Sequence, residues 1–206
     1  MGARTRRLAA LGLVVTALSA CAREKPPAAP PPQIPTIVAP TSASKIRPMV
    51  DRPMPEDCEL IVPVERVNEL IGRKMEGELK MIVGIPEPSI ARTAKIDCYH
   101  DVPKGKNFAE SPLIIGLATY ADEASAKERV AESVEAEKKE GGQATEVEVT
   151  KHKAQLVTTG AERLLIGSLG KTTYVVRTKA GYLPEDKVKD MLTALAVQSM
   201  TPIEDA

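Results

Sequence analysis

Proline is spread very unevenly along this chain of 206 residues, because ten of its seventeen prolines lie between residues 22 and 55. Proline fixes φ and has no backbone N–H to donate, so such a segment cannot form a regular helix or an inner strand. We expect residues 21–56 to be a disordered, partly polyproline II tether; a ligand for a proline-binding groove is the alternative. Folding is thereby confined to about residues 57–201, which can support one core, with a tail at 202–206.

Residues 1–20 have the three parts of an export signal. Three arginines stand among the first seven residues, residues 8–18 are almost wholly apolar, and Ser19 and Ala20 precede Cys21. This apolar run is too short to cross a bilayer as a mature helix. The segment therefore predicts a cleaved signal peptide and an exported protein. In the simplest version of this interpretation, Cys21 is incidental.

The four residues Leu18-Ser19-Ala20-Cys21 resemble the lipobox of bacterial lipoproteins. The resemblance implies that the Cys21 thiol carries diacylglycerol, with palmitate-type chains, and that cleavage makes Cys21 the new N-terminus. Two or more acyl chains anchor a protein stably. No later stretch reaches eighteen apolar residues, so the anchor is the expected membrane contact. The domain should lie on the outer leaflet of the cell membrane, or in the periplasm or at the outer membrane of a host with two membranes.

Composition excludes several classes of protein. Hydrophobic residues at 43% and charged residues at 27% rule out a wholly disordered chain, and aromatic residues at 2% argue against a stacking surface for single strands. Removing the three arginines of the export signal from the 28 bases leaves 25 bases against 28 acids. That balance is not a footprint for nucleic acid.

Periodicity and turn residues between 57 and 201 predict an α+β domain with a mainly antiparallel sheet flanked by about three helices. The expected order is a helix, three strands, a helix, several strands and a closing helix. The expected elements are a helix from Pro63 to Gly72, strands at 79–83, 93–100 and 112–120, a helix from Asp122 or Ser125 to Glu140, strands at 146–151, 154–158, 163–167 and 172–178, and a helix from Pro184 with a stripe of Val188, Met191, Leu192, Leu195 and Ala196.

Two cysteines, Cys58 and Cys98, remain after Cys21 is assigned to lipid. In an exported domain such a pair most simply forms one disulfide. Closure of about forty residues should add a few kcal/mol, near 4 kcal/mol in the loop-entropy treatment. A metal site that includes His100 is the alternative, but Cys-x-His alone supplies too few ligands, so no metal is expected.

No catalytic constellation emerges from the remaining polar residues. His100 and Asp101 are neighbours on a strand and point to opposite faces, and His152 stands at a strand end between lysines. Ser168 lies in a Gly-Ser-Leu-Gly sequence that fits a hairpin better than a nucleophile elbow. The helix at 122–140 should be a solvated charged face, and it contains the acids Glu128, Glu132, Glu135 and Glu137. We therefore expect a protein that is not an enzyme and needs no cofactor.

Short sequences around the two cysteines follow one another in a fixed order: DCELI at 57–61, Pro63 with ERV at 65–67, LIG at 70–72, DCY at 97–99, and GAE at 160–162 before a hairpin and a closing helix. With the lipobox and tether, this arrangement resembles a group of actinobacterial cell-envelope lipoproteins of uncharacterised function. The resemblance implies an exported domain with one disulfide and an antiparallel sheet flanked by helices. It transfers no catalytic residue.

The leading functional hypothesis is a non-enzymatic binding or scaffolding module of the cell envelope, with the exposed helix at 127–139 as a candidate contact surface for another envelope protein. The alternative is a carrier of a lipid or other apolar ligand, held near Val188 and Leu192 in a cavity between sheet and helices. A hydrolase is the third hypothesis. Methionines could line such a carrier cavity or simply fill the core, namely Met75, Met81, Met191 and Met200.

Overall fold

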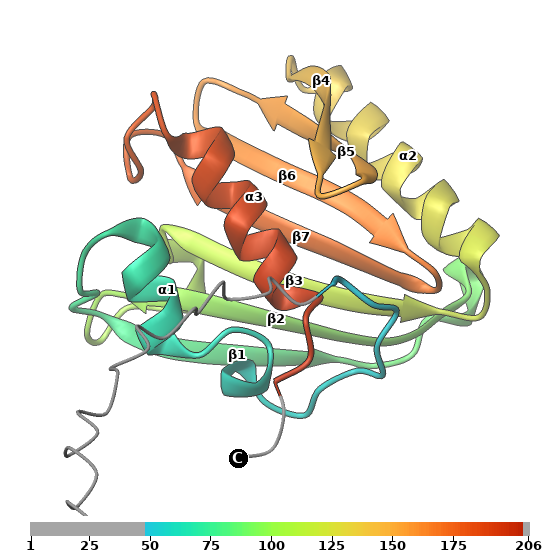
Figure 1. The fold of residues 1–206 in the computed structure, drawn as a ribbon, viewed down its shortest axis with the longest axis horizontal. Helices are drawn as coiled ribbons and strands as arrows, with labels where there is room; N and C mark the ends of the chain where they lie inside the picture. Colours follow the sequence, from blue (N-terminus) through green and yellow to red (C-terminus); the bar gives the residue numbers. More distant parts are fainter. Residues whose placement is uncertain (1–47, 204–206) are drawn as a thin grey trace, which may run out of the picture. The chain divides into compact units, whose positions relative to one another are not determined.

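The computed structural model describes residues 48–203, so the export signal, Cys21 and most of the tether lie outside the described residues. The described part is a single α+β domain with one seven-stranded antiparallel sheet, as the sequence predicts (Figure 1). In chain order its elements are η1 (Cys58–Leu60), α1 (Val64–Ile71), β1 (Glu78–Gly84), η2 (Pro88–Ile90), β2 (Arg92–Val102), η3 (Phe108–Glu110), β3 (Leu113–Tyr120), α2 (Glu123–Lys139), β4 (Gln143–Val149), β5 (His152–Thr158), β6 (Glu162–Leu169), β7 (Thr172–Lys179) and α3 (Val188–Ser199).

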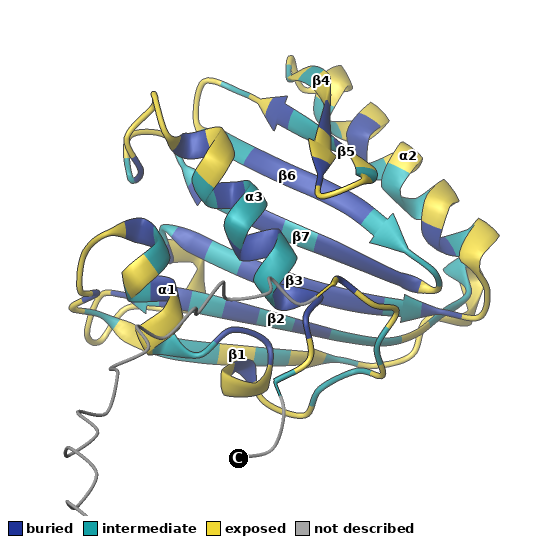
Figure 2. Ribbon diagram, viewed as in Figure 1, coloured by how far each residue is buried: buried dark blue, intermediate teal, exposed yellow. Residues whose placement is uncertain are grey.

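The sheet consists of two meanders joined along one seam. The strand order β1-β2-β3-β7-β6-β5-β4 shows that β1 to β3 pair in sequence, and so do β4 to β7. The seam is the antiparallel pair β3–β7, in which Leu113 lies opposite Thr178 and Leu117 lies opposite Tyr174. Because strand β1 and strand β4 end the sheet, β3 and β7 lie in its interior, and both are largely buried (Figure 2).

The main core lies between the sheet and helices α1 and α3, which cover one face (Figure 1). On this face Ile96, Leu165 and Tyr174 are almost fully buried, and Leu192 packs onto them from α3. Burying such aliphatic and aromatic side chains contributes about 1.5–3 kcal/mol each. The face of the sheet opposite α1 and α3 is therefore the one on which a polar site can lie.

Helix α2 lies on the opposite face and covers only part of it. Val134 of α2 packs against Val157, Leu164 and Ile166 in a small second core. Asp122 caps the helix by accepting a hydrogen bond from the Ser125 N–H at 2.8 Å, as one of the two expected caps. Most of the helix is exposed. It packs on β6, β7 and part of β3, so it covers only one portion of this face.

Residues 48–56 were expected to belong to the disordered tether, but they pack onto the domain. Met49 is buried, and the Asp51 carboxylate accepts hydrogen bonds from the Lys171 N–H at 3.0 Å and the Thr172 hydroxyl at 2.8 Å. Proline restricts regular structure but allows an extended segment to lie against a surface, which is why composition placed the boundary too late.

Two further expectations need correction. Pro184 begins a turn closed by the Lys187 N–H on its carbonyl, and the last helix starts only at Val188. In β1 the apolar positions lie on the core side of the sheet, opposite Cys98 and Ile96, but Met81 is 44% exposed and Val83 is 62% exposed. Both belong to the edge strand β1, whereas α3 packs mainly on β7, β6 and β3.

Helix α1 begins one residue after Pro63 and ends, as expected, at Gly72. Gly72 has φ of 72°, a left-handed conformation in which glycine carries little strain, and its N–H caps the last turn. Among residues 48–203, no helix is both long and apolar enough to cross a membrane.

Candidate functional site

The predicted disulfide is present between Cys58 and Cys98, with the two Cα atoms 5.7 Å apart. It joins η1 to the middle of β2, and both cysteines are buried in the main core. His100 does not share a metal site with them. Within the described residues, no group of three or more His, Cys, Asp or Glu side chains is placed to hold a metal ion.

His100 is a buried residue of the core face of β2. Its side chain is 1% exposed, and its Nδ1 has no hydrogen-bond partner in the described region. Burial lowers the pKa of His100 to about 4, a shift that the nearby Asp101 carboxylate partly opposes. The imidazole is therefore neutral at pH 7 and closed off from any substrate.

Asp101 organises a structural network on the other side of the strand. Its Oδ1 accepts hydrogen bonds from the N–H groups of Glu76 and Gly77, and its Oδ2 accepts one from the Tyr182 hydroxyl at 2.8 Å. Arg73 lies 3.5 Å from the same carboxylate and stacks over the Tyr182 ring. Although burial opposes it, these bonds lower the pKa of Asp101. The network ties the end of β2 to the connection between α1 and β1 and to the connection between β7 and α3.

His152 and Ser168 line one shallow hollow of about 430 Å³ beside the start of α2. Strand register keeps their side chains apart: Ala154 pairs with Gly167, so His152 and Ser168 stand on opposite faces of the sheet. Ser168 lies in β6 just before the Gly170 turn, which confirms the predicted hairpin. His152 is half-buried rather than fully solvated. The pair does not form a nucleophile and its base.

The acids of α2 divide into two groups. Glu128, Glu132 and Glu135 are exposed, as predicted for a solvated face. Glu137 is an exception, because its Oε1 accepts a hydrogen bond from Arg177 at 2.6 Å; the same guanidinium bonds Glu162 at 2.8 Å. Position on a charged helix could not show this, since the partner arginine is forty residues away.

The side chains proposed to line a carrier cavity mostly fill the core. Met75, Met200 and Leu192 are buried members of the main core cluster, and Met191 packs against it. Met81 is the exception, since it lies exposed on β1. Core filling was the competing interpretation of these methionines, and their packing agrees with it.

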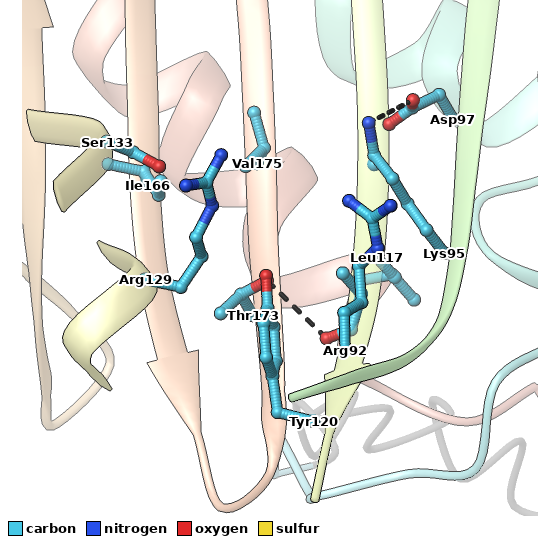
Figure 3. Close-up of a pocket in the computed structure, with 12 residues that line it drawn as sticks. Arg92, Lys95, Asp97, Leu117, Tyr120, Arg129, Ser133, Ile166, Thr173 and Val175 are labelled. Carbon is cyan, nitrogen blue, oxygen red and sulfur yellow. Dashed lines mark hydrogen bonds and ion pairs between the residues drawn. The ribbon is translucent and has the colours of Figure 1, made fainter. Parts of the chain in front are cut away.

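A polar hollow lies where α2 leaves the sheet uncovered (Figure 3). Its volume is about 130 Å³, and it spans the seam between the two meanders. We call it the cationic hollow, and its lining residues are Arg92, Lys95, Asp97, Gly116, Leu117, Ala118, Tyr120, Arg129, Ser133, Ile166, Thr173 and Val175.

A β-bulge aims Arg92 into this hollow. Register shifts between Arg92 and Ala94, so Arg92 lies opposite Tyr120 while Ala94 lies opposite Thr119. Without the extra residue, Arg92 would share the core face with Ala94. Its side chain is only 16% exposed, Nη2 lies 2.6 Å from the Glu87 carboxylate, and the buried Nε has no partner in the described region.

Two more donors face Arg92 across the hollow. Figure 3 shows Arg129 entering from α2, with the Tyr120 ring between it and Arg92. Burial raises the pKa of Tyr120, and hydrogen bonding with Thr173 and the positive charges of Arg129 and Arg92 partly oppose that rise. The hydroxyl therefore lies within the field of both guanidiniums. Arg129 is itself 41% exposed, and its ion pair with the exposed Glu132 is long, at 3.3 Å.

Lys95 and Asp97 line the side of the hollow that β2 forms. Lys95 Nζ lies 2.7 Å from the Asp97 carboxylate, and both project from β2 (Figure 3). Gly116 makes room for this carboxylate, because a Cβ at that position would lie 2.6 Å from Asp97 Oδ1. Lys95 and Asp97 neutralise each other within the lining. The excess positive charge of the lining therefore comes from Arg92 and Arg129, whose partners Glu87 and Glu132 are not among the lining residues.

The hollow continues along α2 into a second depression of about 230 Å³. Arg129, Ser133 and Val175 line both, and Arg177 lies in the second with one of its two carboxylate partners, Glu137. Together they form a groove between α2 and β7, in which the guanidiniums of Arg129 and Arg177 lie among apolar side chains. Its chemistry suits recognition of a polar ligand.

The residues that line this site could not be predicted from local sequence, for a physical reason. Arg92, Tyr120 and Arg129 come from two strands and a helix, and no local spacing links them. One signal was available: Lys95 and Asp97 are charged residues on the outward positions of an inner strand. A polar face on a strand with two neighbours indicates that no core covers that face.

Comparisons with known proteins add little to this geometry. No family model matches the chain. No curated protein matches its sequence. Among solved structures it is similar to the extracellular domain of PknH from Mycobacterium tuberculosis, at 12% sequence identity and a TM-score of 0.42, over 72% of this chain and 97% of that one. At this TM-score the two backbones agree only in part, and no property of PknH is carried over to this chain.

Proposed function

We propose that this chain is a lipid-anchored, extracytoplasmic binding module of the cell envelope, without enzymatic activity, and that its ligand docks in the cationic hollow. The observation that carries the proposal is the open hollow beside α2, where Arg92 presents a buried Nε without a partner in the described region. A buried donor that lacks an acceptor costs about 1–3 kcal/mol. A ligand that supplies the acceptor removes this cost.

Sequence features support the proposed position of the domain outside the cytoplasmic membrane. Leu18-Ser19-Ala20-Cys21 ends an export signal, and a proline-rich segment follows it. The disulfide between Cys58 and Cys98 is typical of proteins that fold in an oxidising compartment. We accordingly place the domain outside the cytoplasmic membrane, held there by lipid on Cys21.

Site-directed photo-crosslinking in the natural host tests the binding proposal. Ser133 lines the hollow, whereas Glu69 is exposed on α1, over the opposite face of the sheet. The full chain with p-benzoylphenylalanine at Ser133 should give a discrete adduct, identified by mass spectrometry, and the chain with the crosslinker at Glu69 should not. The same adduct from both positions, or none from Ser133, would overturn the proposal.

A further inference from the structure

We infer that the cationic hollow recognises a phosphate group; this inference rests on the function proposed above and names the chemistry of its ligand. The hollow is lined by three donor side chains, Arg92, Tyr120 and Arg129, and among them the buried Arg92 Nε has no partner in the described region. Guanidinium groups match the oxygens of phosphate and carboxylate closely, and bonds to such charged acceptors are about twice as strong as neutral ones.

The directions of approach favour phosphate over a carboxylate. Arg92 comes from β2, Tyr120 from β3 and Arg129 from α2, on opposite sides of the hollow (Figure 3). A planar carboxylate offers two oxygens in one plane. A tetrahedral phosphate offers oxygens in several directions and can accept from all three elements at once.

The acidic neighbours do not cancel this charge. Asp97 is already neutralised by Lys95 at 2.7 Å. Glu87 and Glu132, which pair with Arg92 and Arg129, are each about half exposed, so water can solvate them when a ligand takes their place. The exposed pair of Arg129 with Glu132 is worth only about 0–1 kcal/mol, less than a charge-assisted bond to phosphate. Arg92 is only 16% exposed, and it offers phosphate its Nε, which has no partner in the described region.

The first test follows the arginine Nε–H signals of the full chain in neutral detergent micelles by NMR during titration with inorganic phosphate. Saturable shifts are expected at Arg92 and Arg129. The double variant Arg92→Gln with Arg129→Gln should weaken apparent affinity at least tenfold, while Arg66→Gln, an exposed arginine of α1, should change it less than twofold. An equal loss in Arg66→Gln, or no saturable shift in the unmodified chain, would overturn the inference.

A second test separates the two sources of the phosphate group. Glycerol 3-phosphate replaces inorganic phosphate in the titration, and the chain with p-benzoylphenylalanine at Ser133 is crosslinked in phosphatidylcholine vesicles with and without phosphatidylglycerol. Binding of glycerol 3-phosphate supports a soluble phosphate ester, and an adduct that requires phosphatidylglycerol supports a lipid headgroup. A response to neither contradicts the inference.

Failure of this inference can be told apart from failure of the proposed function. If the Ser133 crosslink in the host persists unchanged in the double arginine variant, the hollow binds a ligand, but not through phosphate. If that crosslink is also missing from the unmodified chain, both proposals fail.

Discussion

Single buried polar groups decide much of the behaviour of this domain, and His100 is the clearest case. Its imidazole lies in the core beside Leu113, and Nδ1 lacks a partner within residues 48–203. A charged imidazolium there would lose its hydration, and the nearby Asp101 carboxylate would compensate only part of that loss. The domain can therefore keep His100 only in the neutral form.

This burial predicts a loss of stability in acid. The pKa of His100 falls from 6.5 to about 4 on folding, so between these values the unfolded chain binds more protons than the folded one. Stability is full above about pH 6.5 and declines as pH falls toward 4, by up to about 3 kcal/mol. Urea unfolding at pH 7.5 and pH 4.5 should show this decline, and His100→Leu should reduce it. His152→Gln is the matched control and should retain it; a slope that survives in His100→Leu would exclude His100 as its origin.

Arg92 shows at the same scale what sequence could not predict. Alternation placed the residues from Ala94 to Cys98 on the correct faces of β2, because hydrophobic and polar residues follow the two-residue period there. The bulge beside Ala94 breaks that period for Arg92 alone. A bulge depends on the register between two paired strands. The direction of the Arg92 side chain therefore cannot be predicted from the sequence of β2 alone.

Among the elements, the best-predicted are those with a strong period or a clear cap. β3 is continuously apolar and lies inside the sheet, and α2 ends near Gly141 and Gly142 as expected. Prediction failed where neighbours decide burial. Met81 and Val83 have the pattern of a core-facing strand, but β1 is an edge strand and their side chains remain exposed.

The link between η1 and β2 gives a prediction at the scale of elements. Cys58 and Cys98 are forty residues apart, so their bond restricts the unfolded chain considerably. The double variant Cys58→Ser with Cys98→Ser should lose about 4 kcal/mol or less of unfolding free energy, measured by urea denaturation. Titration of thiols in the exported, unfolded protein provides the control. Two free thiols at Cys58 and Cys98 would show that the bond does not form.

For the molecule as a whole, sequence predicted the fold class and element order but placed the start of the packed domain too late. Met49 is buried and Asp51 holds the turn between β6 and β7, so a chain shortened to residue 57 would lack part of its domain. Such packing depends on contacts about 120 residues away. Local composition cannot predict contacts between residues so far apart in the sequence.

The anchor is likewise a property of the whole molecule. If Cys21 carries lipid, the protein made in its host should fractionate with membranes and incorporate labelled palmitate. Cys21→Ser should abolish the label and lower the share of the protein that fractionates with membranes, because the acyl chains on Cys21 are the proposed anchor. Cys58→Ser serves as the control and should keep the label. Labelling that persists in Cys21→Ser would refute the anchor.

The seam between the two meanders has a consequence for folding. Each meander requires only contacts between successive strands, whereas β3 and β7 must meet across more than fifty residues, and such non-local pairing is slow. The cationic hollow is lined by Arg92 and Tyr120 from one meander, Thr173 from the other, and Arg129 from the helix α2 that connects the two. A ligand bound in the hollow would contact both meanders. By mass action it would stabilise the β3–β7 pairing against local opening, so the ligand-bound domain should be cleaved by proteases more slowly than the unbound domain.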